Sequence, residues 1–164
     1  MRRPWNAAGI VAAMGSYDRR WLETAVKASV VVLYITAALK LVTFLQHPPE
    51  IDLTDPILHV RESWIHFVGG SAEVAVATAL LCTSSTLLRS VILATVGAQF
   101  LWYHAALWLA GWRGRCPCLG SAWDWIGMSE STAEIAAIII AALLLLTGIV
   151  NCVYGWRQGA TGPA

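Results

Sequence analysis

Two cysteines one residue apart are the residues of this chain best suited to chemistry. Cys116 and Cys118 flank Pro117 in the stretch "GRCPCLGS". A disulfide between thiols this close would be strained, and strained, exposed disulfides have higher reduction potentials than structural ones. Closing so short a loop also removes little chain entropy, which argues against a stapling role. The pattern therefore predicts a redox-active pair, with Cys116 as the attacking thiol and Cys118 as the resolving one.

The residues next to the pair support this chemistry. Arg113 and Arg115 would favour a thiolate on either cysteine. Pro117 fixes φ between them, and Gly120 follows where the chain turns back towards the next segment. Two alternatives stay open, an inert or structural pair and half of a metal site. Histidines that could complete a metal site, at no familiar spacing, are His47, His59 and His66.

Composition indicates a chain whose solvent is lipid. Hydrophobic residues make up 57% of the 164, charged residues 13%, and the mean hydropathy is +0.61. Soluble domains usually carry about a quarter charged residues. The net charge of +1 suggests neither a nucleic acid nor an acidic substrate as a partner. We therefore expect an integral membrane protein with the lipid bilayer as its first partner.

Apolar segments define the expected fold. Four of them approach the ~20 residues that cross a ~30 Å hydrocarbon core. They cover residues 25–45, 64–83, 90–111 and 132–153. The connections are short, which predicts an all-α, compact four-helix membrane bundle. Residues 1–24 would form an amino-terminal arm and 154–164 a tail, and "SEST" has residues suited to capping the last helix.

Basic residues predict the orientation. One side of the predicted bundle holds Arg2, Arg3, Arg19, Arg20, Lys27, Arg89 and Arg157, and the other holds Arg61, Arg113 and Arg115. The richer side should be cytoplasmic, with both termini there. The Cys-Pro-Cys loop then faces the periplasm from the bacterial inner membrane, where thiols meet oxidants. Cys82 and Cys152 fall at the cytoplasmic ends of their helices, across the bilayer from the Cys-Pro-Cys loop. They are expected to be buried apolar cysteines.

Ionisable residues within the predicted spans form the second candidate group. Lys40, Glu73 and His104 lie ~7, ~13 and ~10 Å inside their helices at 1.5 Å per residue, all in the half next to the Cys-Pro-Cys loop. Buried charges must be paired, so we expect a Lys40–Glu73 ion pair, with His104, Gln99 and Tyr103 extending a polar pocket. The pair could serve helix packing alone or a proton or quinone site. His66 and Trp64 are expected to anchor the interface.

A family resemblance follows from these motifs in order. "AALKLVTF", "SAEVAVATALL", "TLLRS" and "CPCLG" resemble successive features of the MauE-like membrane proteins, within the wider DoxX-like group of four-helix proteins. The resemblance covers about residues 25–153. It implies redox maturation of a periplasmic protein, as in forming the disulfide-rich small subunit of methylamine dehydrogenase. The wider group is associated with thiol and quinone chemistry.

These observations predict a membrane thiol–disulfide redox protein that assists a periplasmic redox protein or client. Electrons could pass to or from a quinone near Glu73 and His104, although no sequence motif identifies a quinone site. The alternative is a non-catalytic accessory subunit that docks other subunits of a membrane complex through its arm and tryptophans. A small-molecule carrier is less well supported, because the polar group lies away from the bilayer centre.

Overall fold

The computed structural model describes residues 7–46, 53–112, 127 and 129–160. The helices are α1 (Ala7–Gln46), α2 (Glu62–Cys82), α3 (Thr86–Leu109) and α5 (Glu130–Ala160). Within the described ranges the secondary structure is helical apart from an isolated antiparallel bridge between Thr54 and Arg61. The all-α class is therefore confirmed for this part of the chain.

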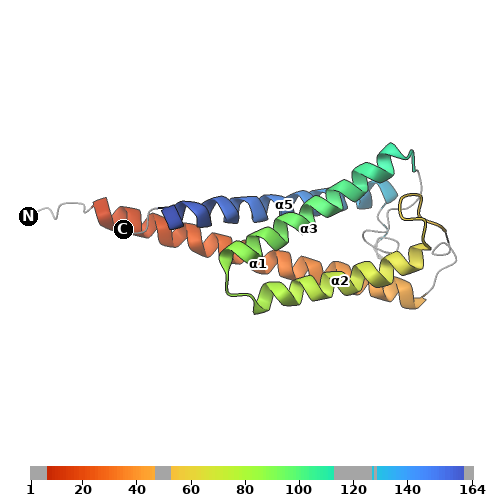
Figure 1. The fold of residues 1–164 in the computed structure, drawn as a ribbon, viewed down its shortest axis with the longest axis horizontal. Coiled ribbons are helices and arrows are strands. Elements are labelled where there is room, and N and C mark those ends of the chain that lie inside the picture. The colour runs from red at the N-terminus through yellow and green to blue at the C-terminus, as the bar shows by residue number, and fades with distance from the viewer. Residues whose placement is uncertain (1–6, 47–52, 113–126, 128, 161–164) are drawn as a thin grey trace, which may run out of the picture.

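The helices run up and down alongside one another (Figure 1). We call the end where α1 finishes and α2 begins the loop end; α3 also finishes there and α5 begins there. The turn end is the opposite one, where Thr83–Ser85 joins α2 to α3. Within the described residues, four helices are long and apolar enough to cross a membrane, over Arg20–Gln46, Glu62–Cys82, Thr86–Leu109 and Ser131–Trp156.

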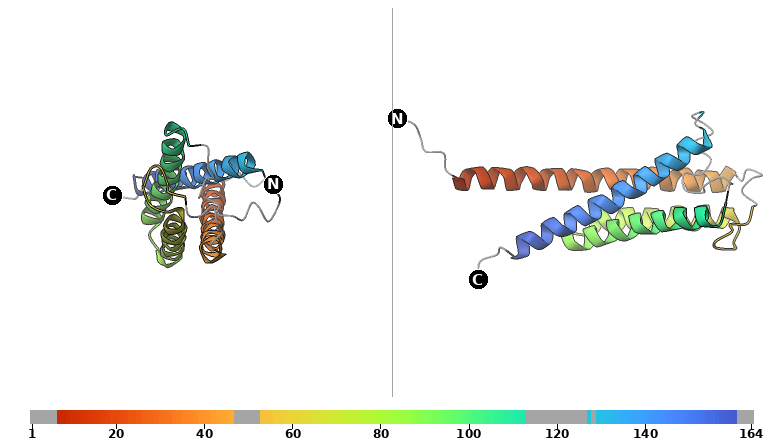
Figure 2. Two further views of the ribbon diagram at one scale, coloured as in Figure 1. Left: turned by 90° about the vertical axis from the view of Figure 1, so that its right-hand side faces the viewer. Right: turned by 90° about the horizontal axis from the view of Figure 1, so that it is seen from above.

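Helix boundaries differ from the expected spans mainly at the turn end. α1 begins at Ala7, so most of the expected arm is helical and continues into the first span; it projects past the other helices (Figure 2). α3 begins at Thr86, where the Ser85 side chain accepts a hydrogen bond from the Leu88 amide. The predicted cap of α5 is present, because the Ser129 hydroxyl accepts from the Thr132 amide at 3.3 Å.

Helix packing follows the small residues. α1 packs mainly on α2 and α3 packs mainly on α5, whereas α2 and α3 touch little despite their short connection. α5 crosses α3 obliquely (Figures 1 and 2) at Gly97 and Gly148. A Cβ on Gly97 would lie 2.4 Å from the Leu145 nitrogen, and one on Gly148 would lie 2.4 Å from the Ala94 nitrogen. Backbone meets backbone at this crossing, as small residues permit in membranes.

Buried side chains divide the interior into two regions. Apolar ones form a core that extends to the turn end: Val26, Val30, Leu33, Ala77, Leu80, Leu93 and Leu144. Buried ionisable side chains gather in the half towards the loop end: Lys40, Asp55, Glu62, His66, Glu73 and His104; the buried polar residues towards the turn end, Ser29, Ser90 and Asn151, are uncharged. Because polar groups are costly in a bilayer unless partnered inside the protein, this second region is the place to look for a site.

Asp55 holds the segment between α1 and α2 against α3. Its carboxylate accepts hydrogen bonds from the amides of Ile57 and Leu58, at 2.8 and 2.7 Å, and from the Tyr103 hydroxyl. Asp55 is only 1% exposed. The loop end is therefore closed on this side by a buried carboxylate with three donors.

Candidate functional site

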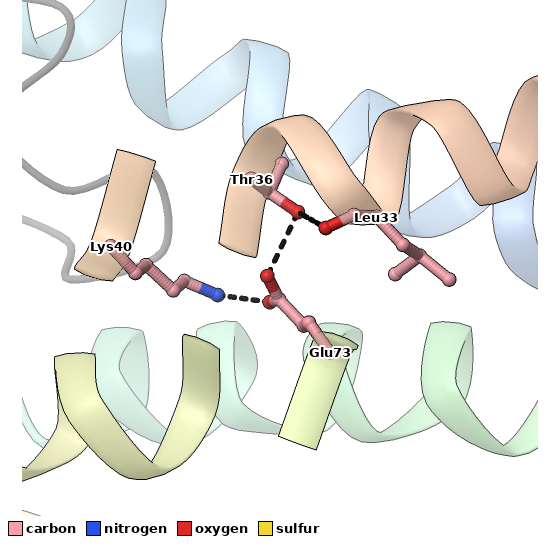
Figure 3. Close-up of polar contacts among 4 residues, drawn as sticks. All are labelled: Leu33, Thr36, Lys40 and Glu73. Atoms are coloured by element: carbon pink, nitrogen blue, oxygen red, sulfur yellow. Dashed lines mark hydrogen bonds and ion pairs between the residues drawn. The ribbon is translucent and has the colours of Figure 1, made fainter. Parts of the chain in front are cut away.

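Lys40 and Glu73 form the predicted ion pair between α1 and α2. The Lys40 ammonium donates to Glu73 Oε1, and the two residues are only 6% and 3% exposed (Figure 3). Gly70 brings the helices together here, since a Cβ on it would lie 3.1 Å from the Ala37 carbonyl oxygen. The long side chain of Lys40 can therefore reach a carboxylate on the neighbouring helix without leaving the interior.

Thr36 completes the partners of the carboxylate, and the sequence interpretation missed it. Its hydroxyl lies 2.9 Å from Glu73 Oε2 and 3.1 Å from the Leu33 carbonyl, so its one hydrogen is shared between two acceptors (Figure 3). Both oxygens of Glu73 are thus engaged. The signal was available in the sequence, because Thr36 precedes Lys40 by one helical turn and so shares its face.

α3 supplies the third wall of the site through Phe100 and His104. The Lys40 ammonium lies 5.1 Å from the centroid of the Phe100 ring, a cation–π geometry that adds a second partner for the charge. His104 is buried one turn further along α3 and lines the same cavity as Lys40 and Glu73. Phe100 was also missed, although it stands at helical spacing from His104.

The cavity between these side chains is small. Its volume is about 20 Å³, and Ala137, Ile140 and Leu144 of α5 close its far side. A single water needs about 10–15 Å³, whereas a benzene ring occupies an engineered cavity of about 150 Å³. The site therefore has room for about one water molecule, and a quinone ring does not fit between the helices as they pack here.

Chemically, the arrangement can hold one fixed pair of opposite charges in an apolar environment. Each charge taken alone would be costly at this depth, and the pair, the Thr36 hydroxyl and the Phe100 ring offset that cost. The hydroxyl, carboxylate and ammonium together can also hydrogen-bond a water in the cavity. The site thus fits a structural charge pair or a proton-holding group, but not a bound ring.

His66 corrects one expectation. We expected it to anchor the interface, but it is only 4% exposed and lies on the buried face of α2. It precedes Glu73 by seven residues. Its Nδ1 is buried and has no hydrogen-bond partner among the described residues. The spacing to Glu73, two helical turns, was the missed signal. Trp64 is exposed, as an anchor should be, whereas Gln99 is exposed and lies outside the polar pocket.

The cysteines divide into two groups. Cys82 is exposed and Cys152 is half-buried, so the expectation of two buried thiols is wrong. Five of the predicted site residues fall outside the described residues, namely Cys116, Cys118, Arg115, Pro117 and Gly120. Among the residues that are described, no cluster of three or more His, Cys, Asp or Glu is placed to hold a metal ion.

Comparison with protein-family models, with curated proteins and with solved structures found no match to this chain. The resemblance to MauE-like proteins therefore rests on the quoted sequence motifs and stays a prediction. Of those motifs, the structure describes Lys40, Glu73 and Arg89, and it brings the first two together.

Proposed function

We propose that the protein is a thiol–disulfide redox protein of the bacterial inner membrane, acting on a periplasmic partner through Cys116 and Cys118. The observation that carries the proposal is the position of the polar interior. Lys40, Glu73 and His104 lie in the half of the bundle towards the loop end. The chain between α3 and α5, which contains both cysteines, leaves and re-enters the bundle at that same end.

Charge distribution supports the orientation in this proposal. Among the described residues, the basic ones towards the turn end are Arg19, Arg20, Lys27, Arg89 and Arg157, and Arg61 belongs to the loop end. The positive-inside tendency favours a cytoplasmic turn end. The loop end then faces the periplasm, an oxidising compartment in which a thiol pair can cycle.

The reaction is thiol–disulfide exchange, in which one S–S bond forms for each that breaks. A thiolate on Cys116 attacks a disulfide of the partner, and the leaving sulfur takes up a proton. Cys118 then attacks the mixed disulfide and releases the reduced partner. The reverse sequence oxidises a partner dithiol and leaves Cys116 and Cys118 reduced. Lys40 and Glu73 act as positioning residues that fix α1 against α2 in the half of the bundle towards the loop end.

Trapping of the mixed disulfide tests this proposal. Cys118→Ser removes the resolving thiol, so membranes from the native host should yield a covalent complex with a periplasmic protein. The complex should run as a DTT-sensitive band on a non-reducing gel. Cys116→Ser should trap little, and Cys82→Ser should match the unmodified protein. The reverse pattern would exchange the two roles and keep the mechanism.

The second candidate function is a non-catalytic accessory subunit of a membrane complex. Trp102 and Trp108 favour it, since both project from α3 with more than two thirds of their surface exposed. Tryptophan is enriched where proteins contact one another as well as at membrane interfaces. If neither cysteine variant traps a partner and both support normal function, the thiol mechanism is wrong and this second function replaces it.

A further inference from the structure

A larger cavity opens at the turn end, far from the ion pair. Its volume is about 310 Å³, within the range of small-molecule sites. The walls come from the first spanning turns of α1, the start of α3, the last turns of α5 and the turn between α2 and α3. Nothing in the proposed thiol chemistry uses this cavity, so its contents need a separate account.

Arg89 gives the cavity its positive charge. Its side chain lines the wall, and its Nε is buried without a hydrogen-bond partner among the described residues. Buried donors are almost always partnered in folded proteins, and an exception calls for a missing acceptor. A guanidinium presents its N–H groups as a planar fork that matches the oxygens of a phosphate or a carboxylate.

The start of α3 points the same way. Thr86 is the first residue of the helix and lines the cavity beside Ser84. The first N–H groups of a helix lack partners within it and carry partial positive charge, and in α3 the Ser85 hydroxyl takes up only that of Leu88. The first turn of α3 contains no acidic residue to neutralise them. Two hydroxyls, a helix start and a guanidinium therefore line one cavity, and all can donate to an anion.

The depth of the cavity indicates where the anion comes from. The span of α1 begins at Arg20, that of α3 begins at Thr86, and that of α5 ends at Trp156. Trp21 and Trp156 are exposed at the same level, as aromatic residues are at the boundary of a bilayer. Phospholipid headgroups lie at this level, and the buried side chain of Val26 gives the cavity an apolar wall.

Glu23 is the one acidic group on the cavity wall. It is exposed at the surface of α1, so solvent and salt screen its repulsion of a bound anion. It should weaken an anion site without abolishing it. This makes Glu23 useful as an experimental lever, since removing its charge should act in the opposite direction to removing that of Arg89.

We propose that this cavity binds the phosphate of a phospholipid headgroup, with Arg89 as its principal contact. The Ser84 and Thr86 hydroxyls and the start of α3 complete the phosphate contacts. The apolar wall at Val26 receives the glycerol or the first carbons of an acyl chain. The site is independent of the proposed redox function and lies at the other end of the molecule.

The test is a lipid titration of the full chain purified in detergent, followed by native mass spectrometry. Phosphatidylglycerol should bind, and diacylglycerol with the same acyl chains, which lacks the phosphate, should not. Arg89→Gln should weaken phosphatidylglycerol binding about ten- to a hundredfold, the usual value of a charge-assisted hydrogen bond. Glu23→Gln should strengthen it.

A second variant keeps the test independent of folding. Gly155 lines the cavity, and a Cβ built on it meets nothing within 4 Å. Gly155→Leu should therefore fill the cavity and abolish lipid binding, whereas the matched Gly155→Ala should leave most of it. Leucine and alanine are both better helix formers than glycine, so neither change should destabilise the helix.

Two results would overturn the proposal. Equal retention of phosphatidylglycerol by the unmodified protein, Arg89→Gln and Gly155→Leu would show that this cavity holds no headgroup. Displacement of the bound lipid by inorganic phosphate, at concentrations that leave Arg89→Gln unaffected, would assign the cavity to a free phosphate compound and remove the lipid from the proposal. Failure of inorganic phosphate to compete supports the lipid.

Discussion

Lys40 of α1 and Glu73 of α2 neutralise one another inside a bundle whose outward faces are apolar. Each side chain is more than nine-tenths buried. The carboxylate also accepts from Thr36, and the ammonium also faces the Phe100 ring. The two charges are therefore tolerated only as a pair. Removing one of them should destabilise the bundle more than removing both.

Glu73→Gln should lower the free energy of unfolding by about 3–5 kcal/mol, the usual cost of leaving a buried charge without its partner. Lys40→Met should cost a similar amount. The double variant with methionine at both positions should recover most of the loss, since an apolar pair satisfies the same space. Denaturant titration of the purified protein in detergent measures all three.

Glu134→Gln is the matched control for this cycle, because Glu134 is exposed at the start of α5. It should change the free energy of unfolding little. Additive losses in the double variant would show that Lys40 and Glu73 stabilise the bundle through separate contacts. Recovery of stability without recovery of partner oxidation would instead assign Glu73 a proton-handling role.

Thr36→Val tests the hydrogen bond to the second carboxylate oxygen. Valine keeps the shape of threonine and removes the hydroxyl that lies 2.9 Å from Glu73 Oε2. Because hydrogen bonds to charged groups contribute about 1.5–3 kcal/mol, the free energy of unfolding should fall by about that amount. Thr24→Val is the control, since the Thr24 hydroxyl donates to the Arg20 carbonyl on an exposed face of α1. Equal effects of the two substitutions would contradict the assignment.

Hydropathy predicted the four long apolar helices well, because a segment able to cross a bilayer needs about the same length wherever it occurs. Pairing of Lys40 with Glu73 was also predictable, since a membrane interior leaves a buried charge few other partners. Helical spacing places Thr36 on the face of Lys40 and Phe100 on that of His104, but hydroxyls and aromatic rings at such spacings occur throughout apolar helices. Only the tertiary packing selects the ones that meet a charge.

Helix pairing was the least predictable feature. A connection of three residues joins α2 to α3, yet these helices touch little. Gly97 and Gly148 decide the contact by letting α3 and α5 approach at backbone distance. His66 was misjudged for a related reason, because its distance from the helix end suggested an interface position. The face on which it lies depends on the rotation of α2 against the bundle.

Gly97→Ala and Gly148→Ala should each destabilise the crossing of α3 and α5. The added methyl would lie 2.4 Å from a backbone nitrogen in either case, and backbone can move only if the helices separate. Overpacking of this kind typically costs about 1–3 kcal/mol. Gly155→Ala is the control, as its Cβ has open space and alanine is favoured in helices by about 1 kcal/mol. The midpoint temperature of thermal unfolding in detergent should fall for Gly97→Ala and Gly148→Ala and not for Gly155→Ala.

Tyr103→Phe should loosen the segment at residues 53–61. The Tyr103 hydroxyl donates to Asp55, and without it one oxygen of a buried carboxylate loses a donor. The remaining amide donors, Ile57 and Leu58, then hold Asp55 alone. Hydrogen exchange of those two amides should accelerate about five- to tenfold, equivalent to about 1 kcal/mol of lost local stability.

Tyr34→Phe provides the comparison for Tyr103→Phe. The Tyr34 hydroxyl bonds the Thr78 hydroxyl on an exposed part of the α1–α2 contact, away from the loop end. Tyr34→Phe should therefore leave hydrogen exchange at the Ile57 and Leu58 amides unchanged. Unchanged exchange in Tyr103→Phe as well would mean that the backbone bonds within the segment, such as Asp55 to Val60, are sufficient to hold it.

Labelling of the thiols tests the orientation on which the redox proposal depends. A membrane-impermeant maleimide, applied to intact spheroplasts after mild reduction, should modify Cys116 or Cys118. Cys82 serves as the internal reference because it is exposed at the turn end, where α2 finishes. It should react only after the membrane is permeabilised. Variants that retain either the first pair or Cys82 alone separate the two signals.

Reaction of Cys82 in intact spheroplasts, with protection of Cys116 and Cys118, would place the loop end in the cytoplasm. The thiol pair would then meet a reducing compartment, and exchange with a periplasmic partner would be impossible.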